Sequence, residues 1–181
     1  MITIVIACFV SFLFVGCGSP NLDDPGTLDD IIAEAIDYYK LQDRGKEGEE
    51  LFYAPNAQTP YTGWSKELYK NGQVFNLTHY KDGEKYGPSV YWSENGQKLS
   101  EMIFNHGRGD EYSYRWYSNG HESEKWIFKD GKVVTVTCWK PNGEKCPITN
   151  VVDGNGEAVF YYEDGTEKER AEFKNGDYLW D

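Results

Sequence analysis

Ten dipeptides of the form Asn-Gly, Asp-Gly or His-Gly punctuate the chain at nearly equal intervals from residue 71 onward. Their glycines are Gly72, Gly83, Gly96, Gly107, Gly120, Gly131, Gly143, Gly154, Gly165 and Gly176. Successive glycines are 11 to 13 residues apart, and every second one is 22 to 24 residues apart. Such dipeptides suit type I′ hairpin turns, because both central residues of that turn have positive φ. The spacing therefore predicts five two-stranded units in an elongated antiparallel β-hairpin repeat sheet.

Two columns of large apolar side chains recur in register with these turns. The first lies four residues before the first glycine of each unit and holds Leu68, Trp92, Trp116, Trp139 and Tyr161. The second lies three residues before the second glycine and holds Tyr80, Phe104, Phe128, Val151 and Phe173. Columns of this kind stack across an antiparallel sheet, so we expect each hairpin to bury its rings against those of its neighbours.

Composition and charge narrow the range of partners. Aromatic residues make up 16% of the 181 residues, and 19 residues are glycine, which is typical of short strands joined by glycine turns. The net charge is -12, so attraction to the phosphates of a nucleic acid is not expected. Residues 18–62 contain 10 acidic and 3 basic side chains, which concentrates the acidic excess ahead of the repeats.

The first residues have the features of an export signal. Ile2 to Val15 form an apolar run that is short for a membrane span, which favours a signal peptide over residues 1–16. Cys17 follows the small residue Gly16 and resembles the lipidated cysteine of bacterial lipoproteins. The resemblance implies that Cys17 carries the lipid and becomes the mature N-terminus. An ordinary signal peptide or an uncleaved anchor is the alternative, since no Lys or Arg precedes the apolar run.

A polar tether and one helix are expected between this signal and the repeats. Residues 17–26 are polar and contain two prolines, as expected of a tether that holds the folded part away from the lipid. Thr27 is a candidate helix N-cap, and apolar residues follow at helical spacing at Leu28, Ile31, Ile32, Ala35, Ile36 and Tyr39. We expect the segment 27–62 to contain this short helix and to cap the array, with a partner-binding helix as the alternative.

The sequence offers little chemistry beyond one pair of cysteines. Cys138 and Cys146 flank the Pro141-Asn142-Gly143 turn symmetrically if its loop has three residues, which in an exported protein predicts a disulfide, with paired buried free thiols as the alternative. The three histidines fall at different positions in their units, and neither Cys-x-x-Cys nor His-Glu-x-x-His occurs, so we expect no metal site and no cofactor. We find no phosphate loop or serine elbow either, and we do not expect an enzyme.

The units also resemble a known family of repeats. The segments Tyr69-Lys70-Asn71-Gly72-Gln73 and Tyr80-Lys81-Asp82-Gly83-Glu84-Lys85-Tyr86-Gly87 are similar to the bacterial variant of the MORN repeat. The resemblance runs from about Gly63 to Asp177, and we assign five such units to residues 63–181. It implies an elongated antiparallel sheet that contacts proteins or lipids. Bacterial proteins with these repeats are often described as antitoxin-like members of toxin–antitoxin systems.

Together these features favour a lipid-anchored protein of the bacterial cell envelope, on the outer membrane if the source is Gram-negative, that binds a protein partner without catalysis. Trp64, Tyr86, Tyr112 and Tyr114 lie outside the two columns and form the candidate binding surface. The first alternative is cell-wall carbohydrate, on which these rings would stack. The second is an antitoxin role, which requires access to a cytosolic toxin and conflicts with export.

Overall fold

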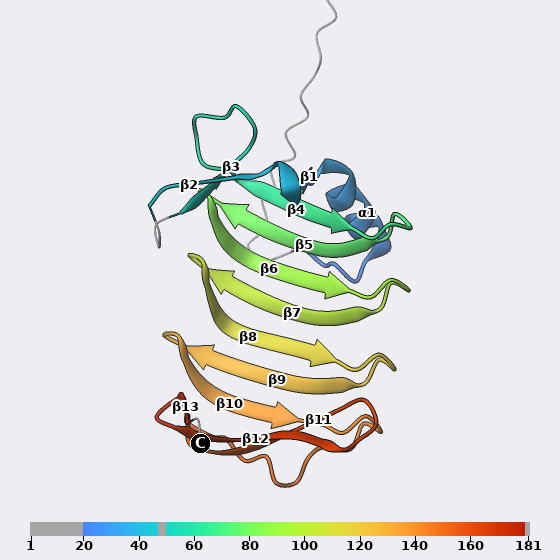
Figure 1. The fold of residues 1–181 in the computed structure, drawn as a ribbon, viewed down its shortest axis with the longest axis vertical. Helices are drawn as coiled ribbons and strands as arrows, with labels where there is room; N and C mark the ends of the chain where they lie inside the picture. The colour runs from blue at the N-terminus through green and yellow to red at the C-terminus, as the bar shows by residue number, and fades with distance from the viewer. Residues whose placement is uncertain (1–19, 47–49, 180–181) are drawn as a thin grey trace, which may run out of the picture.

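A computed structural model gives the fold and describes residues 20–46 and 50–179. As the sequence predicts, the chain is mainly β, with antiparallel sheets and one short helix near the N-terminus (Figure 1). The elements are α1 (Pro25–Glu34), β1 (Ile36–Asp37), the 3-10 helix η1 (Tyr38–Lys40), β2 (Gln42–Arg44), β3 (Leu51–Tyr53), β4 (Gly63–Leu68), β5 (Val74–Lys81), β6 (Glu84–Trp92), β7 (Lys98–Asn105), β8 (Arg108–Trp116), β9 (Glu122–Lys129), β10 (Lys132–Cys138), β11 (Gly156–Tyr161), β12 (Glu167–Lys174) and β13 (Asp177–Leu179).

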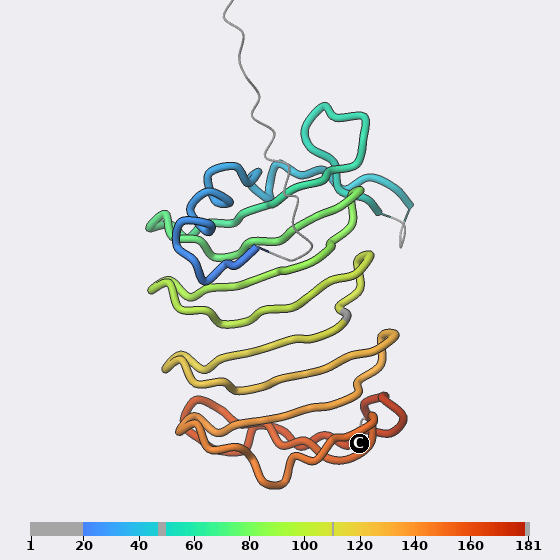
Figure 2. The backbone as a smooth tube through the Cα atoms, turned by 180° about the vertical axis from the view of Figure 1, so that it is seen from behind, coloured from blue at the N-terminus to red at the C-terminus, as the bar shows by residue number. Residues whose placement is uncertain are grey.

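The main sheet has eight strands in the order β1-β4-β5-β6-β7-β8-β9-β10. From β4 to β10 each strand pairs antiparallel with the next in sequence, whereas β1 pairs parallel with β4. β11, β12 and β13 form a second sheet, and β2 and β3 form a hairpin. Figures 1 and 2 show the strands of the main sheet stacked like rungs, with α1 at the β4 end and the second sheet at the β10 end.

Helix α1 begins earlier than the sequence pattern suggests. Its N-cap is Asp24 and not Thr27, because one carboxylate oxygen of Asp24 accepts hydrogen bonds from both the backbone N–H and the hydroxyl of Thr27 at 2.8 Å. Pro25 occupies the first turn, where its missing N–H removes no helical bond. The helix ends at Glu34 because the next residues become extended and pair with β4. The expected helical stripe therefore stops short of Tyr39, which is 82% exposed.

The helix and the segment before it pack on the main sheet. Ile31 of α1 and Ala35, which follows the helix, are buried together with Leu77 of β5 and Val90 of β6. Leu22 joins the same cluster and is only 8% exposed. Burial of this apolar side chain fixes residues 20–24 on the sheet, so this part of the segment 17–26 belongs to the folded structure. Residues 1–19, with the predicted signal peptide, lie outside the described residues.

The ten glycine turns are of two kinds that alternate along the chain. In five of them both residues of the dipeptide have positive φ, as at Asp82 (φ 52°) and Gly83 (φ 85°), in the predicted type I′ geometry. In the other five only the glycine has positive φ. The prediction of type I′ geometry is therefore wrong at Gly72, Gly96, Gly120, Gly143 and Gly165.

The second kind of turn contains one more loop residue. At Gly120 its N–H donates to the carbonyl of Tyr117 at 2.9 Å, and the Tyr117 N–H donates to the carbonyl of His121 at 2.9 Å. This pattern is a type I turn followed by a glycine bulge. The side chain of Asn119 accepts a hydrogen bond from the His121 N–H at 3.0 Å. Asparagine therefore serves these turns through its side-chain oxygen and not through positive φ.

The main sheet does not continue through all five predicted units. Between β10 and β11 the described chain forms only isolated bridges, Trp139 to Lys145 and Val152 to Asn155. Pro147 lies in the segment where the next strand was expected, and proline lacks the N–H that a strand within a sheet donates. The chain instead folds back, so that the second sheet packs on β9 and β10 through a core of Val136, Cys138, Cys146, Val151, Ala158, Val159, Phe160, Ala171 and Phe173.

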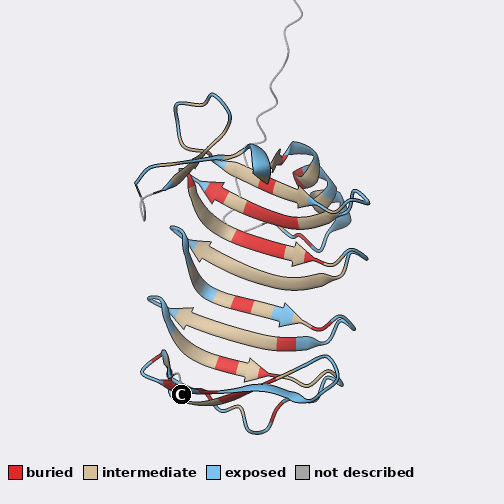
Figure 3. Cartoon of the chain, viewed as in Figure 1, coloured by how far each residue is buried: buried red, intermediate tan, exposed pale blue. Residues whose placement is uncertain are grey.

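Only part of the predicted aromatic columns is buried. Trp92, Tyr80 and Phe173 are buried as expected, whereas Trp116, Trp139, Tyr161, Phe104 and Phe128 are half-buried. Leu68 is 46% exposed. Figure 3 shows the same division, with the largest buried stretches on β5 and β6 and mostly intermediate residues on β7 to β9. The reason is that the middle of the main sheet is a single layer, which α1 and the second sheet cover only near its ends.

Two glycines with similar φ test this account of the turns. A Cβ added at Gly154 (φ 73°) would lie 2.5 Å from the Gly176 nitrogen and 2.8 Å from the Val133 carbonyl oxygen, whereas one added at Gly96 (φ 82°) meets nothing within 4 Å. We expect Gly96→Ala to lower the free energy of unfolding by about 1 kcal/mol through backbone strain alone. Gly154→Ala should cost about 1–3 kcal/mol more, because backbone atoms must move. Urea denaturation measures both, and equal losses would contradict the turn-on-turn contact.

A candidate binding face on the main sheet

The two faces of the main sheet are distinguished by register. Lys66, Leu77, Val90, Glu101, Tyr114 and Lys125 form one row of directly paired residues from β4 to β9. Leu77 and Val90 of this row pack against α1, so the row lies on the helix face. The neighbouring row contains Trp126 of β9, which packs against the second sheet. The helix and the second sheet therefore cover opposite faces at opposite ends of the main sheet.

Apart from α1 and residues 20–24, no part of the chain that the structure describes covers the helix face, and we call the remaining part of this face the open face. Its residues are Tyr86, Lys98, Glu101, Ile103, Tyr112, Tyr114, Trp116, Lys125 and Ile127. All of them are half-buried, so their side chains are held by neighbours and still reach solvent. An aromatic surface of this kind is typical of a site of protein contact.

Three rings line up along β8 at the centre of the open face. Tyr112 and Tyr114 meet edge to face with centroids 5.1 Å apart, and Tyr114 and Trp116 are 5.9 Å apart at 20° between their planes. The Lys125 ammonium lies 5.0 Å from the Tyr114 centroid, and the Lys98 ammonium lies 5.7 Å from the Trp116 centroid. Both distances are within the range of cation–π attraction. The row therefore combines aromatic area with positive charge in an acidic protein.

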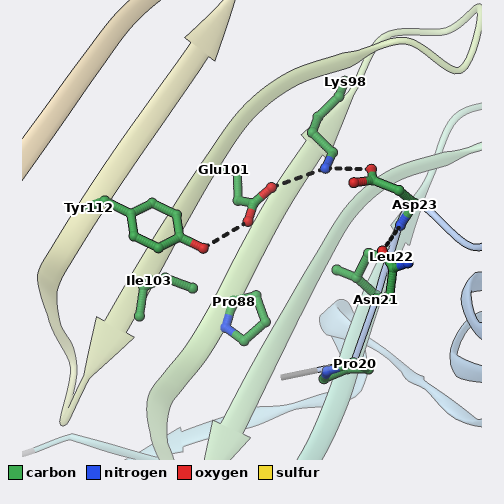
Figure 4. A pocket seen from close by; sticks show the side chains of 9 residues that line it. All are labelled: Pro20, Asn21, Leu22, Asp23, Pro88, Lys98, Glu101, Ile103 and Tyr112. Atoms are coloured by element: carbon green, nitrogen blue, oxygen red, sulfur yellow. Dashed lines mark hydrogen bonds and ion pairs between the residues drawn. The ribbon is translucent and has the colours of Figure 1, made fainter. Parts of the chain in front are cut away.

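A polar network fixes one end of this row. The Lys98 ammonium donates to Asp23 at 2.8 Å and to Glu101 at 3.0 Å, and the Tyr112 hydroxyl donates to Glu101 at 3.2 Å (Figure 4). These groups surround a hollow of about 220 Å³, whose wall is formed on one side by residues 20–23. The network joins the N-terminal segment to β7 and β8.

Two further hollows continue the first along the open face. One of about 310 Å³ shares Asp23 and Lys98 with it and reaches Trp116. The other, of about 270 Å³, shares Ile103 and Tyr112 and reaches Tyr86. Because neighbouring hollows share lining residues, the three together form a groove across β6, β7 and β8.

The network shifts two pKa values. Burial lowers the pKa of Lys98, but the hydrogen bonds to Asp23 and Glu101 outweigh this effect, so the net pKa is raised. The pKa of Tyr112 is raised to about 12, first by burial and then by the charge of Glu101 and the hydrogen bond to it. Both shifts favour the protonated forms that make the network at neutral pH.

The predicted binding residues all lie on the helix face but not at one site. Tyr112 and Tyr114 touch, and Tyr86 lines a hollow together with Tyr112. Trp64 of β4 lies apart from them, in a hollow beside α1. Sequence reasoning missed Trp116, which had been placed in a buried column. The alternation of Tyr112, Tyr114 and Trp116 along one strand is the signal that identifies it, because residues two apart share a face.

The predicted disulfide between Cys138 and Cys146 is absent, and both side chains are buried free thiols. The residues do lie opposite each other, because the Cys146 N–H donates to the Cys138 carbonyl at 2.8 Å. In such hydrogen-bonded pairs the Cβ atoms are up to about 5.5 Å apart, whereas a disulfide needs roughly 3.5–4.5 Å. Burial raises the pKa of Cys138 to about 12, which makes this thiol a poor nucleophile. The Cys146 sulfur is 3.2 Å from the Tyr161 hydroxyl.

The remaining predictions concern metals, membranes and relatives. Among the described residues no group of three His, Cys, Asp or Glu side chains is placed to hold a metal ion. No helix in residues 20–46 or 50–179 is long and apolar enough to cross a membrane. Cys17 lies outside these residues. No protein-family model matches the chain, and no curated protein matches it.

Titration of Tyr112 tests the network. Because the folded state favours the neutral phenol, this group stabilises the protein fully below the ordinary tyrosine pKa of about 10. That contribution is lost as the pH rises from about 10 through the folded pKa of about 12. The difference between the ultraviolet titrations of the wild type and Tyr112→Phe should therefore have its midpoint near pH 12. A midpoint near 10, with circular dichroism showing an intact sheet, would contradict the network.

Proposed function

We propose that this chain is an exported, lipid-anchored protein of the bacterial cell envelope that binds a protein partner through the open face and catalyses no reaction. The observation that carries the proposal is the row of Tyr112, Tyr114 and Trp116 on β8. Tyrosine and tryptophan are enriched among the residues that dominate binding energy at protein interfaces. The MORN resemblance supports the same role, since it implies a hairpin sheet used for contact.

Rigidity of the row supports the proposal as well. Tyr112 is tied through Glu101 to Lys98, and Lys98 is tied to Asp23 of the N-terminal segment. Side chains that are already ordered lose little conformational entropy when a partner binds, so more of the contact energy appears as affinity. Lys125, whose ammonium lies 5.0 Å from the Tyr114 centroid, also favours a partner with an acidic or carbonyl group beside its apolar contacts.

A second candidate function is binding of cell-wall carbohydrate. The nearly parallel planes of Tyr114 and Trp116, 20° apart, favour it, because neighbouring rings with similar orientation offer a platform for sugar rings. The groove along the open face is open to a chain of sugars. The lysine ammonium groups at 5.0 and 5.7 Å from these rings occupy part of that platform, so we prefer the protein partner.

The anchoring part of the proposal is tested by comparing the wild type with Cys17→Ala in a bacterial host. We expect the wild type to carry a lipid-sized mass increase and to fractionate with membranes, and both properties to vanish in the variant. Intact-mass spectrometry and fractionation measure them. If the wild type remains unmodified in the cytosol, the anchored proposal fails, and the antitoxin role implied by the resemblance is the one to pursue.

The binding part is tested by photo-crosslinking in the intact cell envelope. A photoreactive residue replacing Tyr114 should capture a defined envelope protein, whereas one replacing Tyr162, which is 53% exposed on the second sheet, should not. Trp116→Ala should lower the affinity for the captured protein at least tenfold, roughly 1.4 kcal/mol or more, without lowering the melting temperature.

The two candidate functions give different results in that experiment. Capture from both positions, or an affinity unchanged by Trp116→Ala, would rule out the open face as a protein-binding surface. Tryptophan fluorescence with isolated cell-wall fragments is the matching test for carbohydrate. A saturable change that Trp116→Ala abolishes would replace the protein partner with a glycan.

A further inference from the structure

A fourth hollow lies outside the open face, between α1 and the start of β4. Its volume is about 550 Å³, larger than each hollow of the open face and within the roughly 300–1,000 Å³ typical of ligand sites. Apolar groups line it from both sides, namely Ile31 of the helix, Ala35 directly after the helix, and Trp64 of the strand. Tyr61 adds a second aromatic ring.

The aromatic wall of this hollow is held in place. The Tyr61 hydroxyl donates a hydrogen bond to the Trp64 carbonyl at 2.8 Å, and the Trp64 ring meets His79 edge to face at 5.1 Å. A Cβ at Gly63 would lie 2.8 Å from the Tyr61 hydroxyl oxygen, so the absence of a side chain there permits this position of the tyrosine. The hollow therefore exists before any ligand enters it.

Two carboxylates border the same hollow. Asp30 and Glu34 are four residues apart on α1, so they lie on one side of the helix. Other acids of this region are engaged, since Asp24 caps the helix and Asp37 pairs with Lys40 at 2.6 Å. Among the described residues neither Asp30 nor Glu34 has an ion-pair partner.

We propose that this hollow binds an aliphatic ammonium group, with its methylenes against Trp64 and Tyr61 and its charge between the aromatic wall and the carboxylates of Asp30 and Glu34. An aromatic face and a carboxylate both attract an ammonium ion, and the apolar wall accepts its carbon chain. The acidic excess of residues 18–62 adds long-range attraction for a cation. The site is independent of the partner of the open face.

The probe is n-butylammonium, which carries the same charge and nearly the same chain as a lysine side chain, and n-butanol is its uncharged match. Each is titrated into the folded protein while the indole N–H resonance of Trp64 is followed by NMR, with Trp64→Phe used for assignment. We expect a saturable shift of this resonance with n-butylammonium and a much weaker response to n-butanol.

Charge variants of α1 complete the test. The double variant Asp30→Asn/Glu34→Gln should weaken n-butylammonium binding at least tenfold, whereas Asp29→Asn, on the same helix but outside the hollow, should change it less than twofold. All three side chains are exposed at the surface, so we expect each variant to keep its melting temperature. The proposal is overturned if the Trp64 resonance does not move, if n-butanol binds as well, or if the double variant binds like the wild type.

A titration with a peptide distinguishes two sources of the ammonium group, a lysine side chain of a protein and a small free amine. An end-capped Gly-Lys-Gly peptide is titrated in the same way as n-butylammonium. Tighter binding of the peptide assigns the hollow to a lysine side chain of a protein, and weaker binding assigns it to a small amine. Both results support an ammonium site, provided that the charge variants weaken both probes.

Discussion

Backbone hydrogen bonds hold the repeat together, in the ladders between consecutive strands and between neighbouring turns. On one edge the N–H of Gly107 donates to the Lys85 carbonyl and that of Gly154 donates to the Val134 carbonyl, both at 2.9 Å. On the other edge the Tyr117 hydroxyl donates to the carbonyl of Trp139, 22 residues later, at 2.7 Å. Because the middle of the sheet is a single layer with half-buried rings, apolar burial alone does not fix the spacing of its hairpins. The backbone ladders between consecutive strands set that spacing. The turn contacts add to the ladders at the sheet edges, where each also satisfies a backbone group.

The same local rules explain which parts of the fold were predictable. A glycine at a fixed spacing is required by the turn itself, so the positions of the ten turns and most of the strands between them could be predicted from the sequence, although five of the turns have another geometry than expected. The end of the main sheet could not be predicted. Pro147 disfavours a strand within the sheet, but it does not determine the path of the chain after β10. Its path is decided by packing, with Trp126 and Phe160 stacked 5.5 Å apart between residues that are distant in the sequence. Likewise Asp24 displaced Thr27 as the helix cap because its side chain reaches the Thr27 N–H.

The candidate binding face was likewise only partly predictable from the sequence. Tyr112 and Tyr114 were predicted as binding residues because they lie outside the two columns. Trp116 was not, because the columns were predicted to be buried, and a side chain in a sheet is buried only where another part of the fold covers it. Only the fold shows that α1 stops at β6 and leaves the rings of β8 open. The link between Lys98 and Asp23 spans 75 residues and has no sequence signature. Contacts within one strand were therefore predictable, and contacts between the N-terminal segment and the repeats were not.

The capping of the sheet also determines how a partner can bind. An uncovered strand edge normally invites another chain to pair with it. At β10 this route is occupied, because the Val134 carbonyl accepts from Gly154 and the Val133 N–H donates to the Gly176 carbonyl at 3.2 Å. At the other end β1 pairs with β4. A partner that added a strand would have to displace these bonds, so recognition through side chains of an uncovered face costs less. α1 and the second sheet cover opposite faces at opposite ends of the main sheet. The aromatic row on β8 lies on the part of the helix face that α1 does not cover.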